Sequence, residues 1–305
     1  LIAFQKALAS AMGSSWARFK AEWSARSFDY DDFNEGKWKQ AFGSSSIRCL
    51  NTSTVYQNFR LAEACLMTLI FIWSVIDEWS IGCISYYLIF FTHWVLILTL
   101  AYFWCAWWTT RRAHQEDSPS YLPWYAKAAW LLQDACIPGA IVVAGLHWSL
   151  VVPTMSTGPS LVGYFTQGVN LLILILDIYL SQQPYYLSHG FVVVGLGAAY
   201  LGFSVIYWAL EGTDCRGFPY IYPFLDWSQP ERPAAAAAIL MLLALPAVHV
   251  LLWLVIALCF PGNYRAPSGD MYLSMHLRGE AQCPEPQGAV TGPEHHQVRE
   301  PQATA

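Results

Sequence analysis

Six long apolar runs constrain the fold of this chain more than any other feature of its sequence. An α-helix needs about 20 mostly apolar residues to cross the hydrocarbon of a bilayer. The runs are continuous and do not alternate with a period of two, so they predict helices and not barrel strands. The predicted spans are 59–76, 83–108, 124–152, 160–180, 187–210 and 234–260. We therefore predict an all-α polytopic membrane protein with a six-helix transmembrane bundle.

The composition agrees with a protein that faces lipid. Only 12% of the residues are charged, whereas a soluble domain carries about 25%. The 15 Trp residues suit the boundary between membrane and water. The net charge of −5 gives no clustered basic face, so no nucleic-acid partner is expected. Membrane lipids are the expected partners, and the sequence names no protein partner.

The basic residues predict the orientation, because they collect in short cytosolic connections. The loop between the fifth and sixth spans holds Arg216 and Arg232, offset by four acidic residues. The basic residues on the predicted cytosolic side include Lys37, Lys39, Arg48, Arg60, Arg111, Arg112, Arg265 and Arg278. This pattern predicts cytosolic termini, with the fifth-to-sixth loop on the other side. We expect an integral multi-pass protein of the plasma membrane rather than the endoplasmic reticulum.

The two ends differ from the predicted transmembrane domain, 59–260. In the cytosolic segment 1–58, Trp16, Phe19, Trp23 and Phe28 can form one face of an interfacial helix, or the segment is a charged connector on the headgroups. The tail 261–305 is rich in Pro, Gly, Glu and Gln, a composition typical of disorder. The chain begins at Leu1, without an initiator Met, so it can be a fragment.

The fourth span carries polar residues inside an apolar run. Gln167, Asn170, Asp177 and Ser181 fall within one third of a helix circumference. Such residues face neighbouring helices or a wet cavity rather than lipid. They form either a polar pocket or interhelical hydrogen bonds worth about 0.6–2 kcal/mol each. Gln133 and Asp134 of the third span are candidates for the same pocket. Asp177 lies near the predicted cytosolic end, where a short path to water is expected.

Two other spans contain helix-disturbing residues. In the third span, Gln133 and Asp134 precede Pro138 and Gly139, which predicts a broken or kinked helix. The carbonyl groups freed there are expected to bond the amides of the fourth span. In the sixth span, Pro246 predicts a kink.

The second span places Thr92 as a candidate nucleophile. A catalytic Thr needs a base within hydrogen-bond reach, normally a His from another helix, while a Thr buried in a membrane ordinarily bonds its own helix. The candidate imidazoles are His93, His147, His189 and His249. No metal-binding spacing is present, so neither a metal nor a cofactor is expected. The eight cysteines contain no CxxC pair and are interpreted as small buried hydrophobic residues.

The loop after the fifth span combines turn residues with large aromatic ones. A disordered loop would not need so many apolar side chains, so we predict an ordered cap over the bundle. The candidate residues in this loop are Asp214, Tyr220, Tyr222, Pro223, Asp226 and Trp227.

The same loop carries a family resemblance. "YWALEGTD" followed by "YIYPFLDWSQP" closely resembles a block in the Rolling stone family of multi-pass membrane proteins. The segments "FFTHWVLILT", "TQGVNLLILILDIYLS" and, more weakly, "GKWKQ" are similar to other parts of that family, so the resemblance runs from about Trp38 to Pro261. It implies a helical membrane protein. The founding member is associated with myoblast fusion, and the family has no settled biochemical activity.

A more distant similarity is to the androgen-induced membrane hydrolases, which split fatty acid esters of hydroxy fatty acids with an intramembrane Thr and a His. By pattern their Thr falls on Thr92, and their His falls on Gln167. Glutamine accepts and donates hydrogen bonds but takes no proton near neutral pH, and a missing general base lowers the rate by about 10²–10⁴.

Three hypotheses follow from these patterns. The first is a non-enzymatic membrane protein that acts through its capped outer face and its tail, in cell–cell fusion or membrane organisation. The second is a lipid-ester hydrolase with Thr92 as nucleophile, which the resemblance leaves without its His. The third is a transporter or receptor whose ligand lies against Gln167, Asn170 and Asp177.

Overall fold

The computed structural model describes residues 37–50, 53–155 and 158–259. Six helices in it are long and apolar enough to cross a membrane, as the sequence predicts, and the described residues contain no strand beyond an isolated bridge between Ser45 and Ser181. The predicted interfacial helix and the tail 261–305 lie outside the described residues.

The first helix of the bundle begins earlier than its apolar run. Helix α3 covers Ser53–Ser80, whereas the sequence predicted 59–76. Arg60 was therefore counted wrongly among the residues that precede the first span, because it lies inside α3. The extra turns are tolerated because Arg60 is buried, with only 1% of its surface exposed, and does not face the lipid.

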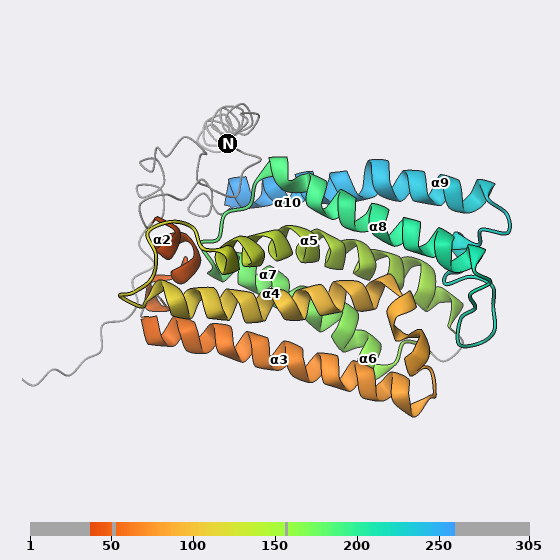
Figure 1. Cartoon of the computed structure of the whole chain (residues 1–305), viewed down its shortest axis with the longest axis horizontal. Helices are drawn as coiled ribbons and strands as arrows, with labels where there is room; N and C mark the ends of the chain where they lie inside the picture. The colour runs from red at the N-terminus through yellow and green to blue at the C-terminus, as the bar shows by residue number, and fades with distance from the viewer. Residues whose placement is uncertain (1–36, 51–52, 156–157, 260–305) are drawn as a thin grey trace, which may run out of the picture.

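The second span begins later than predicted, at Phe91 instead of residue 83. Residues after α3 form a short 3₁₀ helix, η3 (Ile84–Ile89), and helix α4 then covers Phe91–Ala113. In Figure 1, α3 and α4 lie side by side along most of their length.

Helix α5 (Trp124–Leu146) forms the centre of the bundle. It contacts α4, α7, α8 and α10, and 72% of its most apolar stretch is buried, against 22% for the span that contains α8. Helix α5 continues through Pro138, so the broken form of the predicted helix is wrong, while the kinked form stays a prediction. A Cβ atom on Gly139 would lie 3.3 Å from Val95 Cγ2, so this glycine permits α4 and α5 to approach closely.

The fourth span contains a change of helix type. A short helix α6 (Leu161–Gly163) leads into a π-helical segment, η6 (Tyr164–Val169), and then into α7 (Asn170–Leu180). Ser181 lies just beyond the end of α7, so it does not belong to the helical stripe predicted from its spacing. A further π-helical segment, η4 (His147–Val151), follows α5.

The last two spans pack against α5 on its other side (Figure 1). Helix α8 covers Gly190–Ala209, after a 3₁₀ turn, η7 (Leu187–His189). The sixth span consists of α9 (Glu231–Ile239), a π-helical segment η9 (Leu240–Ala244) and α10 (Leu245–Cys259). The π-helical segment lies directly before Pro246, where the lost N–H disturbs the hydrogen-bond ladder.

A short helix before the first span, α2 (Lys37–Gly43), packs against one end of the bundle, on α4 (Figure 1). Its Trp38 is fully buried and donates its indole N–H to the carbonyl oxygen of Pro119 at 3.0 Å. Thr110 donates to the carbonyl oxygen of Phe42 at 3.0 Å. Part of the predicted segment 1–58 is therefore packed against the bundle.

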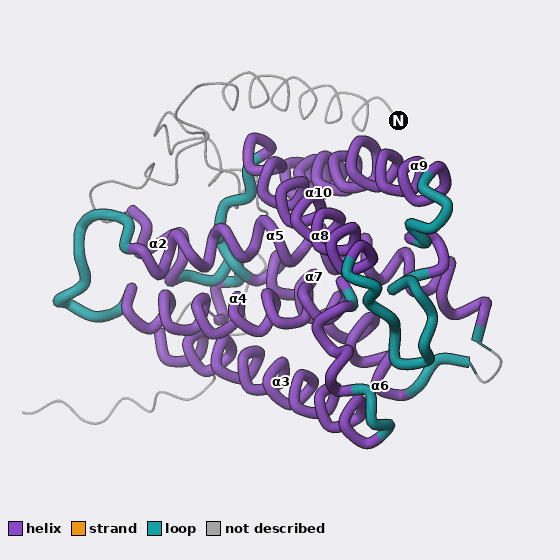
Figure 2. Tube along the Cα trace, turned by 45° about the vertical axis from the view of Figure 1, so that its right-hand side comes forward, coloured by secondary structure: helices purple, strands orange, loops and turns teal. Residues whose placement is uncertain are grey.

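The serines that follow α2 close the end of α7. Leu180 has a carbonyl group without an intrahelical partner, and it accepts from the Ser45 hydroxyl and from the Ser46 N–H, both at 2.8 Å. Ser46 also donates to the carbonyl oxygen of Ser181 at 2.6 Å. Loops gather at the two ends of the bundle (Figure 2).

Candidate functional site

The polar residues of the fourth span are buried, but they do not share one environment. Gln167 is 6% exposed, Asn170 4% and Asp177 0%, so none of them faces lipid. Asn170 donates to the carbonyl oxygen of Thr166 in its own helix, at 3.3 Å. Among the described residues, no hydrogen bond joins the amide of Gln167 or of Asn170 to the third span, which differs from the expectation from the sequence.

Asp177 belongs to a charged cluster with α3 and α4. Arg60 donates to one carboxylate oxygen of Asp177, and the Tyr102 hydroxyl donates to the other. Arg60 also lies 3.4 Å from Glu63 Oε2 and has its guanidinium over the Tyr56 ring, 5.2 Å from the centroid. The predicted short path from Asp177 to water is wrong, because the carboxylate is fully buried and paired.

Thr92 lies at the other end of the bundle, beside the loop that follows α8. Its side chain is partly exposed and interacts with the Tyr222 phenol, which also interacts with Tyr200. Burial raises the pKa of Tyr222, so the phenol stays protonated at neutral pH and cannot act as a base. None of the hydrogen bonds of the described residues joins Thr92 to Gln167 or to an imidazole.

The four candidate imidazoles have other surroundings. His93 stacks on Tyr87 with ring centroids 3.7 Å apart, and its Nδ1 lies 2.5 Å from the Tyr87 carbonyl oxygen. His147 lies beside Gly163, where an added Cβ would come within 3.7 Å of Nε2. His189 and His249 belong to a second buried cluster.

That second cluster joins α5 to the segment before α8. His189 Nδ1 lies 2.7 Å from Asp134 Oδ2, and both side chains are fully buried. The Tyr185 hydroxyl lies 2.7 Å from His249 Nδ1, and His249 Nε2 lies 3.1 Å from the Tyr186 carbonyl oxygen. Asp134 therefore pairs with His189, and this contact connects α5 to the turn that precedes α8.

Gln133 precedes Asp134 on α5 and is also buried, at 1% exposure. Its side-chain oxygen has no hydrogen-bond partner, while its main-chain oxygen accepts from the Cys136 thiol at 3.9 Å. The pocket role predicted for Gln133 stays a prediction.

The structure also has an apolar groove of about 520 Å³, with Ile141 of α5, Leu172 and Ile175 of α7, and Val255 of α10 in its lining. Gln167, Asn170 and Asp177 do not line it. The groove therefore gives no support to a polar ligand held against those three residues.

The loop after α8 begins with a helix-terminating motif. Gly212 donates its N–H to the Tyr207 carbonyl oxygen at 2.9 Å, and Glu211 donates to that of Trp208 at 2.9 Å. Glu211 has a φ of 58°, at a position where glycine is usual. The Tyr207 ring covers Gly212, where a Cβ would lie 2.5 Å from the ring, and its hydroxyl donates to the Thr213 carbonyl oxygen at 2.7 Å.

Asp214 then organises a tight turn. Its Oδ1 accepts from the N–H of Arg216 at 2.9 Å and from that of Phe218 at 2.7 Å. Gly217 adopts a φ of 84° inside the turn. A side-chain oxygen that holds two main-chain donors explains why an aspartate stands at this position.

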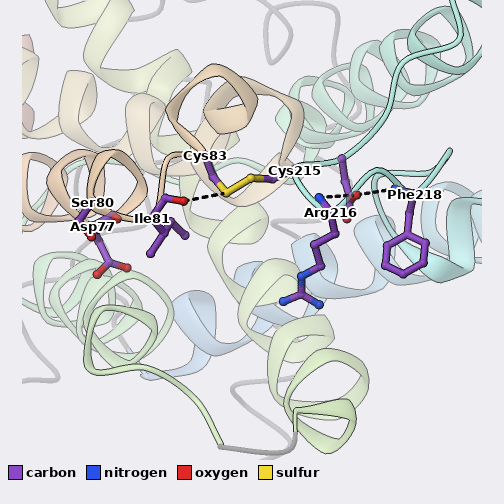
Figure 3. The surroundings of a disulfide bond; sticks show 8 residues. Asp77, Ser80, Ile81, Cys83, Cys215, Arg216 and Phe218 are labelled. Atoms are coloured by element: carbon purple, nitrogen blue, oxygen red, sulfur yellow. Dashed lines mark hydrogen bonds between the residues drawn. A yellow bond between two sulfur atoms is a disulfide. The ribbon is translucent and has the colours of Figure 1, made fainter.

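A disulfide between Cys83 and Cys215 ties this turn to the connection between α3 and α4 (Figure 3). The interpretation of these two cysteines as small buried hydrophobic residues is wrong. Cys136 is a free, buried thiol, as that interpretation expects, while Cys65 is free and exposed. Cys49, at the opposite end of α3, is also disulfide-bonded.

The remaining part of the loop lies on the bundle through aromatic residues. Asp226 Oδ1 accepts from the N–H and the hydroxyl of Ser228, at 3.0 and 2.6 Å. Trp227 donates its indole N–H to the Ser204 hydroxyl of α8 at 3.2 Å.

Two pairs of aromatic rings stack within the same loop. Tyr222 and Phe224 stack with ring centroids 5.1 Å apart. The aromatic rings of Tyr220 and Phe218 also stack, at 5.3 Å, and Pro223 begins the 3₁₀ turn η8 (Pro223–Leu225).

The fold defines a polytopic α-helical membrane protein with two buried polar clusters, one around Asp177 and one around His189. The family model described as "Protein rolling stone" matches residues 32–261, so the chain belongs to the rolling stone family. Protein rolling stone of Drosophila melanogaster is 26% identical over 108 residues, which cover 35% of this chain and 39% of that protein. The alignment therefore spans well under half of that relative. No solved structure matches the chain.

Proposed function

We propose that this chain is a non-enzymatic membrane protein that presents the loop 210–230 at the cell surface and acts in cell–cell fusion or membrane organisation. The observation that carries the proposal is the fixed form of this loop. Asp214 and Asp226 each hold main-chain donors, and Cys215 is bonded to Cys83. A surface held in one form binds a partner with less loss of conformational entropy. The resemblance to a family whose founding member is associated with myoblast fusion supports this role.

The proposed orientation places this loop outside the cell and both termini in the cytosol, in the plasma membrane. It rests on the basic residues, because Lys37, Lys39, Arg111 and Arg112 lie at the end opposite to Cys83 and Cys215. Disulfides form in oxidising compartments, which agrees with an external position of the Cys83–Cys215 bond. Since Cys49 is disulfide-bonded at the other end, the cysteines alone do not decide the orientation.

The test is a cell-fusion assay with the full chain and with Asp214→Ala and Asp226→Ala. Each variant leaves main-chain N–H groups without their acceptor, so the loop loosens and fusion is expected to fall. Gln229→Ala is the matched control, because Gln229 is an exposed residue of the same loop. Surface biotinylation separates loss of activity from loss of delivery. Unchanged fusion after replacement of the whole loop would contradict the proposal.

A lipid-ester hydrolase is the second candidate, and the contact between Thr92 and Tyr222 is the observation in its favour. A hydroxyl held by a phenol is positioned, but it still lacks a base to accept its proton. Lipid analysis with purified protein and with Thr92→Ala tests this candidate. Ester cleavage that is lost in Thr92→Ala would favour the hydrolase, and an active-site-directed probe that never labels Thr92 would count against it.

A further inference from the structure

The cluster around Arg60 contains one acidic group more than it can neutralise. Arg60 is 1% exposed, Glu63 5% and Asp177 0%. Arg60 is the one cationic group that ion pairs place beside the two carboxyl groups, in the part of the chain that the structure describes. If both carboxyl groups were ionised, an uncompensated negative charge would be buried inside the bundle, which is far less favourable than a neutral acid.

The hydrogen bonds show which carboxyl group is the anion. Asp177 accepts from Arg60 with one oxygen and from the Tyr102 hydroxyl with the other, and both donors favour a carboxylate. Glu63 has a single contact, 3.4 Å from its Oε2 to Arg60 Nη1. Its Oε1 is buried and has no hydrogen-bond partner. The negative charge therefore belongs to Asp177.

Glu63 is one of three buried polar residues on the same face of α3. Tyr56, Arg60 and Glu63 are spaced by four and three residues on α3, so they lie on one face of the helix. The Tyr56 hydroxyl is buried beside Arg60, and it interacts electrostatically with Arg60, Asp177 and Glu63. The Glu63 Oε1 atom is thus a buried acceptor without a donor, and such an atom requires an explanation.

A proton on Glu63 accounts for its unpaired carboxyl oxygen better than a bound metal ion does. A metal ion would be repelled by the Arg60 guanidinium, which already contacts Glu63. The other titratable groups that face the cluster are Tyr102 of α4 and Cys136 of α5, and neither is a cation. A proton on Glu63 cancels the excess charge and gives Glu63 a donor of its own.

We propose that Glu63 is a proton-binding site within the first span. With the bundle packed, the proton sits on the Glu63 carboxyl group, which lies beside Arg60. When the cluster opens, the O–H bond breaks, the proton passes to water and Glu63 becomes a carboxylate. Packing of α3 against its neighbours is thereby linked to the uptake of one proton.

Infrared spectroscopy of the full chain in lipid nanodiscs tests the proposal. With ¹³C-labelled glutamate carboxyl groups, the protonated-carboxyl band at neutral pH is expected to shift, which assigns it to a glutamic acid without any substitution. The band is expected to be lost in Glu63→Gln and kept in Glu116→Gln, the control, since Glu116 is exposed. No glutamic acid band at neutral pH, or a band that survives in Glu63→Gln, would overturn the proposal.

The pH dependence of unfolding gives a second readout. Glu63 is protonated in the packed state and ionises on unfolding, so the native chain is expected to lose stability as the pH rises above the ordinary range of a glutamic acid. Glu63→Gln copies the neutral acid, and it is expected to fold and to lose this part of the pH dependence. Coincident pH profiles, or a Glu63→Gln protein that does not fold, would contradict the proposal.

Discussion

At the scale of single residues, the ion pair between Arg60 and Asp177 joins α3 to α7 inside the bundle, with both side chains buried. The helical spacing of Asp177 indicated a buried position, and the structure places it there. Its partner Arg60 was counted as a loop residue because it precedes the most apolar part of α3. The sequence did contain an indication that Arg60 is buried. An arginine next to an apolar run, with Glu63 one turn away, requires a partner inside the bundle. Periodicity along one helix does not tell which residue of another helix it meets.

Arg60→Met is expected to destabilise the chain by about 3–5 kcal/mol, because it leaves Asp177 buried without its counter-ion. The double variant Arg60→Met/Asp177→Leu is expected to recover most of the loss, since neither charge remains. The measurement is SDS-induced unfolding of the purified chain in one detergent. Arg111→Met is the control and should change stability by no more than about 0.5 kcal/mol, because Arg111 is exposed. A single variant as stable as the native chain would show that the ion pair does not hold the bundle together.

At the scale of elements, apolar length predicted the existence of each span better than its ends or its regularity. The break expected at Pro138 is absent, because Pro138 and Gly139 lie in the best-packed helix of the bundle. The π-helical segments of the fourth and sixth spans have no signature that the hydrophobic pattern detects. The Cys83–Cys215 bond joins two connections that are adjacent only in the folded chain, so spacing could not reveal it.

The start of α8 provides a test of element packing. A Cβ atom on Gly190 would lie 3.0 Å from His249 Cδ2, and His249 cannot retreat because Tyr185 and Tyr186 hold both of its ring nitrogens. Gly190→Ala is therefore expected to destabilise the chain by about 1–3 kcal/mol, the usual effect of overpacking.

Gly195→Ala is the matched control on the same helix, because nothing lies within 4 Å of its added Cβ. It should leave stability unchanged or raise it by about 0.5–1 kcal/mol, since alanine favours a helix more than glycine does. The measurement is thermal unfolding of both variants, which compares the stability of Gly190→Ala with that of Gly195→Ala. Equal stability of Gly190→Ala and Gly195→Ala would mean that α8 and α10 do not meet as closely as the structure shows.

At the scale of the whole molecule, the connections between the six spans lie at two opposite ends of one helical bundle. The connection between α4 and α5 lies at the end that carries α2, and the loop 210–230 lies at the other (Figure 2). The proposed function depends on this division, because a surface that meets other cells has to lie outside, while the basic connections stay in the cytosol.

Cysteine labelling in intact cells tests this division most directly. Gln229→Cys places a thiol in the loop 210–230, and Asp117→Cys places one in the connection between α4 and α5, both at exposed positions. A membrane-impermeant maleimide is expected to label Gln229→Cys in intact cells and Asp117→Cys only after permeabilisation. Labelling of both positions from the same side would contradict the six-span bundle, and labelling of Asp117→Cys alone would reverse the proposed orientation.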